Sequence, residues 1–341
     1  MSTATPTLNA KRPELSFNAT IPRNLVHRAS VCEVFLTDAV QVDADHFLCG
    51  GQLPRVHSFF SDQAGAPPRY DSLLLMEVAR QASILVAHRF LGVPLDHKFT
   101  FISGGISVVD PQALVFGALP GELTVDLRIV GERLRDGERV GVEVILDMAV
   151  AGAPAATART AFMWMTPQQW DAFRARGRAK RGIIGGDPLP LGPGADPAAV
   201  GRAAAQNVVI GPIVAGDQDF LAPVRVDLSH PCLFDHPLDH VPGMLVFEAF
   251  RQAAMASAGA HHGLAPANLV MSDCTADFVT FGEFEHPIMC HAEVGDVVDS
   301  AAAEAYPVVP VRLEMRQQDQ TIARATIELS VHCHRVRRIG G

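Results

Sequence analysis

The sequence predicts an α+β fold made of two similar halves, each an antiparallel sheet wrapped around one central helix. A motif occurs twice: Phe47-Leu48 lie ten residues before His57, and Phe220-Leu221 lie ten residues before His230. In each half the His is followed about twenty residues later by Glu-x-x-Arg-Gln inside a long apolar run. Four segments with strand-type alternation follow each run. A repeat of this length indicates a duplicated domain rather than a solenoid array.

Composition sets the broad class of the protein. With 341 residues, 48% hydrophobic and 19% charged, the chain is expected to fold around a sizeable core. Its net charge of −9 argues against a general nucleic-acid binder. The six cysteines include no Cys-x-x-Cys pair, so neither a disulfide framework nor a zinc site is expected. Residues 1–22 lack the apolar segment of a signal peptide, and we expect a cytoplasmic protein with reduced thiols.

The first half follows the order expected of one sheet and one helix. Residues 1–20 are expected to form a flexible arm, and residues 21–170 the first repeat. A helix is predicted over residues 71–91, with Asp71 or Ser72 as N-cap and Gly92 just past its end. A turn-rich loop is expected at residues 61–69. The strands predicted around this helix cover residues 31–36, 46–53, 99–109, 123–133, 140–150 and 157–165.

A linker of residues 171–206 precedes the second half. Its basic run, residues 174–181, is expected to be a solvated connector; contact with a phosphate or a carrier protein stays open as the alternative. The second repeat, residues 207–334, ends before a tail at residues 335–341. Its helix is predicted over residues 242–262. Its strands are predicted over residues 220–228, 269–281, 288–294, 308–315 and 321–332. Joining the two sheets edge to edge would give one continuous core.

The two predicted helices carry charged residues where core residues are expected. Glu248 and Arg251 are three positions apart, so they share a helix face, and Gln252 extends it. Their neighbours in the sequence are apolar, which predicts that both side chains are buried. The desolvation of such a pair costs on the order of several kcal/mol per ion, and other interactions must offset this cost. The same register recurs in the first half. A purely structural buried pair remains possible, but the repetition favours a functional site.

A segment at the second helix entry resembles a known fold family. The sequence from Phe234 through His236, Pro242 and Gly243 to Glu248-Ala249 is similar to the helix entry of hotdog-fold β-hydroxyacyl-carrier-protein dehydratases. Arg-Gln after the Glu departs from the dehydratase pattern. That departure, its repetition and the segment Arg55-Val56-His57-Ser58-Phe59-Phe60 resemble a narrower family: the A-factor biosynthesis proteins, double-hotdog synthases of γ-butyrolactone signals.

The resemblance implies a tandem hotdog fold and a specific activity. Members transfer a β-ketoacyl chain from acyl carrier protein, or from CoA, onto the hydroxyl of dihydroxyacetone phosphate. No metal and no redox cofactor is implied. Hotdog active sites combine residues from both protomers of a dimer, so the fused halves form an internal pseudo-dimer. We therefore expect His57 to pair with Glu248, and His236 or His240 to pair with Glu77.

The chemistry assigns roles to these residues. A carboxylate whose pKa is raised by burial can act as base, which suits Glu248. Arg251 offers a fork for the phosphate, with Gln252 beside it. The amides of Gly243 and Met244 are candidate oxyanion donors at an open helix end.

The first half has the same constellation with a different helix entry. Glu77, Arg80 and Gln81 are its counterparts, but Asp71-Ser72 replace Pro-Gly. The first half is therefore expected to complete the site of the second.

Several alternatives stay open at this point. His57 and His230 can simply end strands and bond locally; His240 can be a residue that fixes its loop. His332, Cys333 and His334 lack a third metal ligand and are expected to be surface residues. A dehydratase or thioesterase of the same fold would not need the repeated arginine. A non-catalytic acyl- or lactone-binding regulator would tolerate loss of Glu248.

Overall fold

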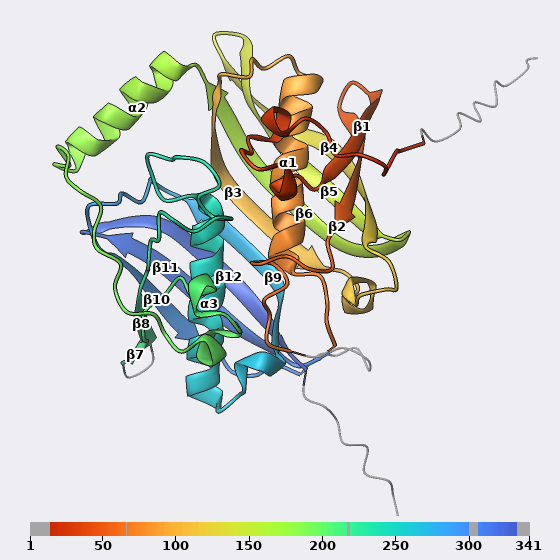
Figure 1. Cartoon of the computed structure of the whole chain (residues 1–341). Helices are drawn as coiled ribbons and strands as arrows, with labels where there is room; N and C mark the ends of the chain where they lie inside the picture. The colour runs from red at the N-terminus through yellow and green to blue at the C-terminus, as the bar shows by residue number, and fades with distance from the viewer. Residues whose placement is uncertain (1–13, 66, 217–218, 300–305, 333–341) are drawn as a thin grey trace, which may run out of the picture.

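The strands of the protein form one continuous sheet. The computed structural model describes residues 14–65, 67–216, 219–299 and 306–332. The 12-stranded sheet has the order β1-β2-β4-β5-β6-β3-β9-β12-β11-β10-β8-β7 (Figure 1). The strands are Leu36–Asp43 (β1), His46–Leu53 (β2), Lys98–Val108 (β3), Gly121–Arg135 (β4), Glu138–Val150 (β5), Ala153–Met165 (β6), Val214–Ala215 (β7), Asp219–Pro223 (β8), Leu269–Phe278 (β9), Ile288–Val294 (β10), Val308–Gln317 (β11) and Gln320–Val331 (β12).

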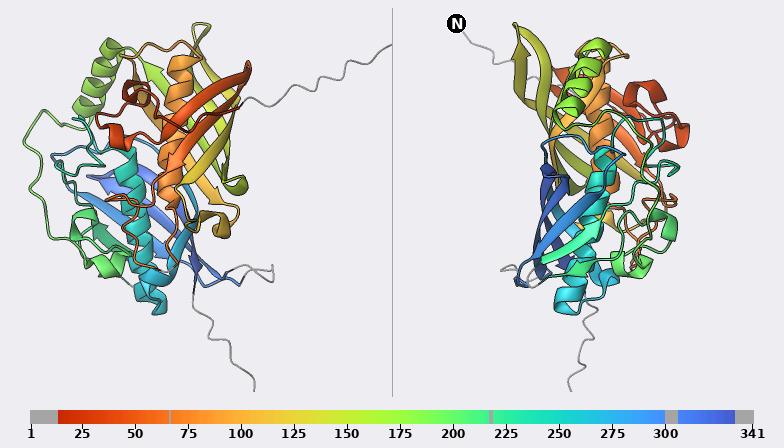
Figure 2. Two further views of the ribbon diagram at one scale, coloured as in Figure 1. Left: turned by 45° about the vertical axis from the view of Figure 1, so that its right-hand side comes forward. Right: turned by 90° about the vertical axis from the view of Figure 1, so that its left-hand side faces the viewer.

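The two halves meet at the centre of this sheet. Strands β3 and β9 pair antiparallel, from Ser103 opposite Asp277 to Ser107 opposite Asp273. Helix α1 (Ser72–Arg89) packs on the first half and α3 (Gly243–His262) on the second, both on the same side of the sheet (Figures 1 and 2). The prediction of two helix-wrapping sheets joined edge to edge is confirmed.

The central helices are apolar on nearly every side because they are enclosed on nearly every side. Every residue of α1 except Arg80 and Arg89 is buried. Asp71 is its N-cap, as predicted, and accepts a hydrogen bond from the Leu73 N–H at 2.9 Å. In α3 the residues from Leu245 to Ala258 are all buried, and Gly263 ends the helix in the left-handed region (φ 66°).

The basic run is part of a third helix. Helix α2 (Pro167–Lys180) begins with a capping box of Thr166 and Gln169. The Arg174 side chain is only 6% exposed, and its Nη1 lies 2.7 Å from Glu283 Oε1. Arg178 Nη2 lies 2.5 Å from Glu285 Oε1. The expected solvated connector is therefore wrong for these two arginines, because carboxylates of the second half pair with them and dock α2 there.

Two predicted strands are misplaced. Val31–Glu33 is a 3-10 helix instead of a strand, and β1 begins only at Leu36, as the first arm of a hairpin with β2. Strand β8 stops at Pro223, and the residue after it, Val224, still donates its N–H to the Ile288 carbonyl at 2.8 Å. The other 3-10 helices are Arg23–Val26, Pro111–Leu114, Pro197–Val200, Ala205–Asn207 and Pro266–Asn268. Among the described residues, no helix has both the length and the hydropathy needed to cross a membrane.

Candidate active site

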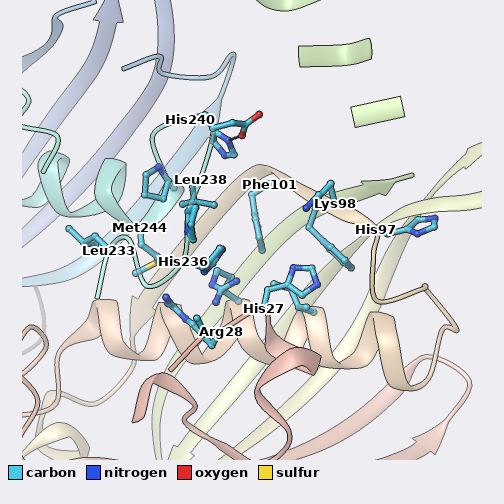
Figure 3. A pocket seen from close by; sticks show the side chains of 18 of the residues that line it. His27, Arg28, His97, Lys98, Phe101, Leu233, His236, Leu238, His240 and Met244 are labelled. Carbon is cyan, nitrogen blue, oxygen red and sulfur yellow. Dashed lines mark hydrogen bonds and ion pairs between the residues drawn. The ribbon is translucent and has the colours of Figure 1, made fainter. Parts of the chain in front are cut away.

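A large cavity lies between α1 and the loop that leads into α3. Its volume is about 730 Å³, within the range of small-molecule sites. Figure 3 shows His27, Arg28 and His236 gathered on one side, with His97 and Lys98 further along. The aromatic and aliphatic walls include Ile84, Phe99, Phe101, Trp170, Phe247 and Phe278. The polar side chains on its walls include those of His27, Arg28, Arg80, Lys98, His236 and His240, and the backbone of Gly243 also lines it.

Two arginines of the cavity wall share one buried carboxylate. Glu77 is fully buried, and its Oε1 lies 2.6 Å from Arg28 Nη2 and 2.8 Å from Arg80 Nη2. Gln81 Nε2 donates to the same oxygen at 2.7 Å. Burial alone would raise the pKa of Glu77, but Arg28 and Arg80 outweigh it and lower the pKa to about 2. The expectation of a carboxylate with a raised pKa is therefore wrong for Glu77, which stays ionised.

His236 is placed where a base could work. It lies in the cavity wall, and its Nδ1 is 3.5 Å from Asp235 Oδ2. Asp235 is itself held by the N–H groups of Ala29 and Ser30, at 2.5 and 2.9 Å. Burial lowers the pKa of His236, and the charges of Arg28 and Arg80 lower it further against the opposing effect of Asp235. A neutral imidazole can accept a proton.

The N-terminus of α3 opens onto the same cavity. Its N-cap is Pro242, which offers no capping side chain, and Gly243 and Met244 line the cavity. The first N–H groups of a helix have no acceptor within it. A Cβ on Gly243 would meet only the Phe278 ring, at 3.6 Å, so a ligand can come close to the backbone here. This helix end is therefore suited to bind negative charge.

His240 lies nearer to α2 than to Glu77. Its Nδ1 is 2.6 Å from Asp239 Oδ1, and its ring packs on Trp170 and Phe281. It borders the cavity, but its contacts also fix the loop. The structure thus brings His236 to the Glu77 side, as expected, and gives His240 a position at the far wall.

The second half repeats the ion network around Glu248. Arg202 Nη2 lies 2.9 Å from Glu248 Oε1, Arg251 Nη2 lies 2.5 Å from Oε2, and Gln252 Nε2 donates to Oε1. All four side chains are buried. None of them lines the large cavity. Glu248 and Arg251, the residues that the sequence analysis ranked first, therefore belong to the network that is less accessible from the large cavity.

Sequence reasoning missed the second arginine of each network. Arg28 and Arg202 occupy matching positions, within Val26-His27-Arg28-Ala29 and Val200-Gly201-Arg202-Ala203. His27 and Gly201 both have left-handed backbones, with φ of 52° and 70°. The repeated Val-x-Arg-Ala was a detectable signal, since Arg28 and Arg202 are 174 residues apart, close to the 173 that separate His57 and His230.

One contact breaks the symmetry of the two networks. Arg251 Nη1 lies 2.9 and 2.8 Å from the two carboxylate oxygens of Asp71, the N-cap of α1. The matching N-cap of α3 is Pro242, which has no carboxylate. Arg80 accordingly has Glu77 and the Val26 carbonyl as its hydrogen-bond partners among the described residues, and its side chain remains 18% exposed. The first network is open to an anion where the second already holds one.

His57 does not pair with Glu248. Its Nε2 lies 3.3 Å from Glu33 Oε1, and its Nδ1 accepts from the N–H groups of Phe59 and Phe60. An accepting Nδ1 leaves the proton of the neutral ring on Nε2, the nitrogen that lies near the carboxylate. Cys232 Sγ lies 3.5 Å from Glu33 Oε2, so the three residues could be read as a metal site. A ring protonated on Nε2 has no free nitrogen for a metal, so these contacts favour a polar cluster around Glu33 over a metal site.

Gln81 and Gln252 bind backbone rather than the cavity. Gln81 Nε2 donates to the Glu33 carbonyl and its Oε1 accepts from the Phe35 N–H. Gln252 makes the equivalent pair with Asn207 and Val209. These contacts place the segments that carry Arg28 and Arg202, so the expected direct substrate contact of either Gln is not supported.

Comparisons with known proteins agree with the duplication. A family model described as the A-factor biosynthesis hotdog domain matches residues 9–166 and again residues 190–332. A 2-oxo-3-(phosphooxy)propyl 3-oxoalkanoate synthase of Streptomyces virginiae is 34% identical over 305 residues, which cover 89% of this chain and 95% of the relative. Synthases of the same name from Streptomyces coelicolor and Streptomyces griseus are 34% and 30% identical, and cover 80% and 87% of this chain and 82% and 91% of their own.

Proposed function

Because the chain belongs to the A-factor biosynthesis hotdog family, we propose that it is an acyltransferase that joins a 3-oxoacyl chain to dihydroxyacetone phosphate. The product named for its relatives is an ester whose alcohol part is that phosphorylated triose. The observation that carries the proposal is the large cavity, which combines apolar walls with Arg80, His236 and the open end of α3. An acyl chain and an anionic acceptor need these two kinds of surface together.

The phosphate of the acceptor binds Arg80 and the first amides of α3. The support comes from the second half, where Asp71 contacts both Arg251 and the Leu73 N–H. The matching partners in the first half are Arg80 and the Met244 N–H, with no carboxylate between them. A substrate anion at this position would receive the same two kinds of donor.

His236 is the base of the reaction. The acceptor hydroxyl attacks the thioester carbonyl; a C–O bond forms and the C–S bond breaks. The hydroxyl proton passes to His236 and from there to the departing thiolate, so His236 returns to its neutral form. The Gly243 N–H lies at the same helix end and stabilises the negative charge on the carbonyl oxygen. Glu77 orients Arg28 and Arg80 rather than taking the proton.

The 3-oxoacyl chain lies along the aromatic walls of the cavity. Phe99 and Phe101 come from β3, and Phe247 and Phe278 from the second half. Burying this chain supplies binding free energy of about 0.8 kcal/mol per methylene. Substitutions on these walls should therefore change the preferred chain length without changing the acceptor.

The acyl donor is a carrier-protein thioester. The support is limited to charge: Lys98 at the cavity wall and Arg176 and Lys180 on α2 are exposed, and such residues can receive an acidic partner. A CoA thioester is the alternative donor. Comparing kcat/KM for the two donors carrying one acyl chain tests this, and gel filtration tests whether the internal pseudo-dimer associates further.

The decisive experiment is the mass of the product. Purified protein is incubated with a 3-oxoacyl thioester, with and without dihydroxyacetone phosphate. A phosphorylated ester that forms only with the acceptor supports the acyltransferase. Free acid without acceptor would indicate a thioesterase, a dehydrated thioester would indicate a dehydratase, and binding without turnover would indicate a regulator.

A further inference from the structure

A second, smaller cavity lies against Arg251. Its volume is about 190 Å³, and none of the residues that the structure describes lines both cavities. Residues of both halves form its walls, among them Ser61, Gln63, Arg69 and Phe116 from the first half and Gly201, Met255, Leu269 and His332 from the second. The reaction proposed above uses none of them.

Two buried nitrogen atoms of the lining residues lack a hydrogen bond. Arg251 Nε and His332 Nε2 have no partner among the described residues. The Arg251 side chain is only 3% exposed, and its other nitrogens are taken by Asp71 and Glu248. The His332 ring is fixed by stacking on Tyr306, with centroids 3.7 Å apart. Because an unpaired buried polar atom is costly, a group bound in this cavity is expected to satisfy them.

The charge of the cavity selects the kind of group. Within the described ranges, no Asp or Glu lines the cavity. Glu248 and Asp71 balance the charges of Arg202 and Arg251. Arg69, also in the wall, forms no ion pair with a described residue, and burial lowers its pKa. One positive charge is therefore left uncompensated at the wall, which favours an anion over water.

We propose that this cavity is a binding site for a small anion of the phosphate class, held by Arg69, Arg251 and His332. Its volume is several times that of one water molecule, which occupies about 30 Å³ in the liquid. Arginine forks match phosphate oxygens in charge and geometry. Arg251 and Gly201 are the counterparts of Arg80 and His27, so the site is a reduced copy of the large cavity. It retains the arginine, Arg251, and its volume is too small for an acyl chain.

Anomalous diffraction locates the anion directly. Crystals of the full chain are soaked in tungstate, an electron-dense phosphate analogue, and compared with unsoaked crystals. We expect an anomalous peak between Arg69 and Arg251 in the small cavity. A peak confined to the large cavity, or density for water only, overturns the proposal.

Thermal unfolding tests the site in solution. Inorganic phosphate should raise the Tm, since a ligand that binds only the folded state stabilises it. Arg80→Gln weakens phosphate binding in the large cavity, and the part of the remaining Tm shift that depends on Arg69 and His332 belongs to the small one. It should be lost when Arg69→Gln or His332→Gln is added. It should persist with Arg133→Gln, a matched change at an exposed arginine of β4. A shift unchanged by Arg69→Gln and His332→Gln contradicts the site.

Competing ligands identify the source of the phosphate group. In the Arg80→Gln background, inorganic phosphate and dihydroxyacetone phosphate are compared, with dihydroxyacetone as the uncharged control. Equal shifts with the two phosphates indicate a free-phosphate site. A larger shift with dihydroxyacetone phosphate indicates a site for the phosphorylated triose. A shift with dihydroxyacetone alone overturns recognition of the anion. This assay measures binding without turnover, so it stands even if the proposed acyltransferase activity fails.

Discussion

Asp71 Oδ2 lies 2.8 Å from Arg251 Nη1 and joins the N-terminus of α1 to the buried ion network of α3. The counterpart of Asp71 is Pro242, so Arg80 receives no carboxylate from the other half. The two networks are otherwise alike, each with a Glu, two Arg and a Gln. This single difference leaves Arg80 without a carboxylate of the other half at the wall of the large cavity, and it argues for one acyl-transfer site per chain.

Replacing Arg80 should impair use of the phosphorylated acceptor. Arg80→Gln is expected to lower kcat/KM for dihydroxyacetone phosphate by about 10²-fold, because a charge-assisted fork to the phosphate is lost. The KM for the acyl donor should change little. Steady-state kinetics with each substrate varied in turn measures both effects.

Arg251→Gln is the matched control for that experiment. It removes the same kind of side chain from the closed network, so it should lower stability and leave turnover per folded molecule unchanged. Equal kinetic losses in the two variants would mean that both networks take part in catalysis.

Replacing Glu248 should affect stability rather than chemistry. Glu248→Gln leaves Arg202 and Arg251 without their shared carboxylate, and breaking a buried pair of this kind costs roughly 3–5 kcal/mol. Urea unfolding should show the loss, while the folded fraction keeps its kcat. Glu77→Gln should lose both stability and activity, because Glu77 holds two arginines of the cavity wall. A large fall in kcat for Glu248→Gln at full folding would restore its catalytic role.

Much of the fold could be predicted because it depends on local pattern. The long apolar runs around Glu77 and Glu248 predicted both central helices, and Asp71 predicted the start of α1. The failures lie where distant contacts decide. Residues 174–181 look like a solvated charge run until Glu283 and Glu285 are placed beside them.

The sequence predicted which residues form the site better than it predicted their exposure and their charge states. The pairing of His236 with the Glu77 side followed from the duplication. The choice of Glu248 over Glu77 stays a prediction that the accessibility of the two networks does not favour. That accessibility depends on Asp71, which is 180 residues from Arg251 in the chain. The pKa of Glu77 could not be read from the sequence either, since Arg28 reaches it from a different segment.

The activity should depend on a neutral His236. Its pKa is lowered below the ordinary 6.5, so the base form predominates at neutral pH, and kcat/KM should fall only when the pH drops through that lowered value. His236→Gln should reduce kcat by about 10²- to 10⁴-fold. Arg80→Gln removes a nearby positive charge and should move the acidic limb of the profile to higher pH. If the acidic limb of the pH profile does not move in Arg80→Gln, a group other than His236 produces it.

Acid should destabilise the fold through buried neutral histidines, above all His27. Burial, with His88 and Arg80 nearby, lowers the pKa of His27 to about 3. Its Nε2 lies 2.8 Å from His88 Nε2, and His88 Nδ1 donates to the Val93 carbonyl, so His88 Nε2 accepts from the His27 Nε2–H. Protonating His88 removes this acceptor, and protonating His27 places a positive charge in a partly buried site beside His88 and Arg80. Between pH 6.5 and 3 the unfolded state binds the additional proton. The stability from His27 is therefore complete above pH 6.5 and is lost as the pH falls, by up to about 1.4 kcal/mol per unit.

His27→Asn isolates this contribution, because asparagine tolerates the left-handed backbone at this position and does not titrate. Urea unfolding of both proteins at pH 7.5, 6.0 and 5.0 gives the free energy of unfolding at each pH. The wild type should lose stability more steeply than the variant below pH 6.5, since the other histidines titrate in both. Parallel curves would show that His27 gains a proton as easily in the folded as in the unfolded chain, and would rule out the buried neutral pair as the acid-sensitive element.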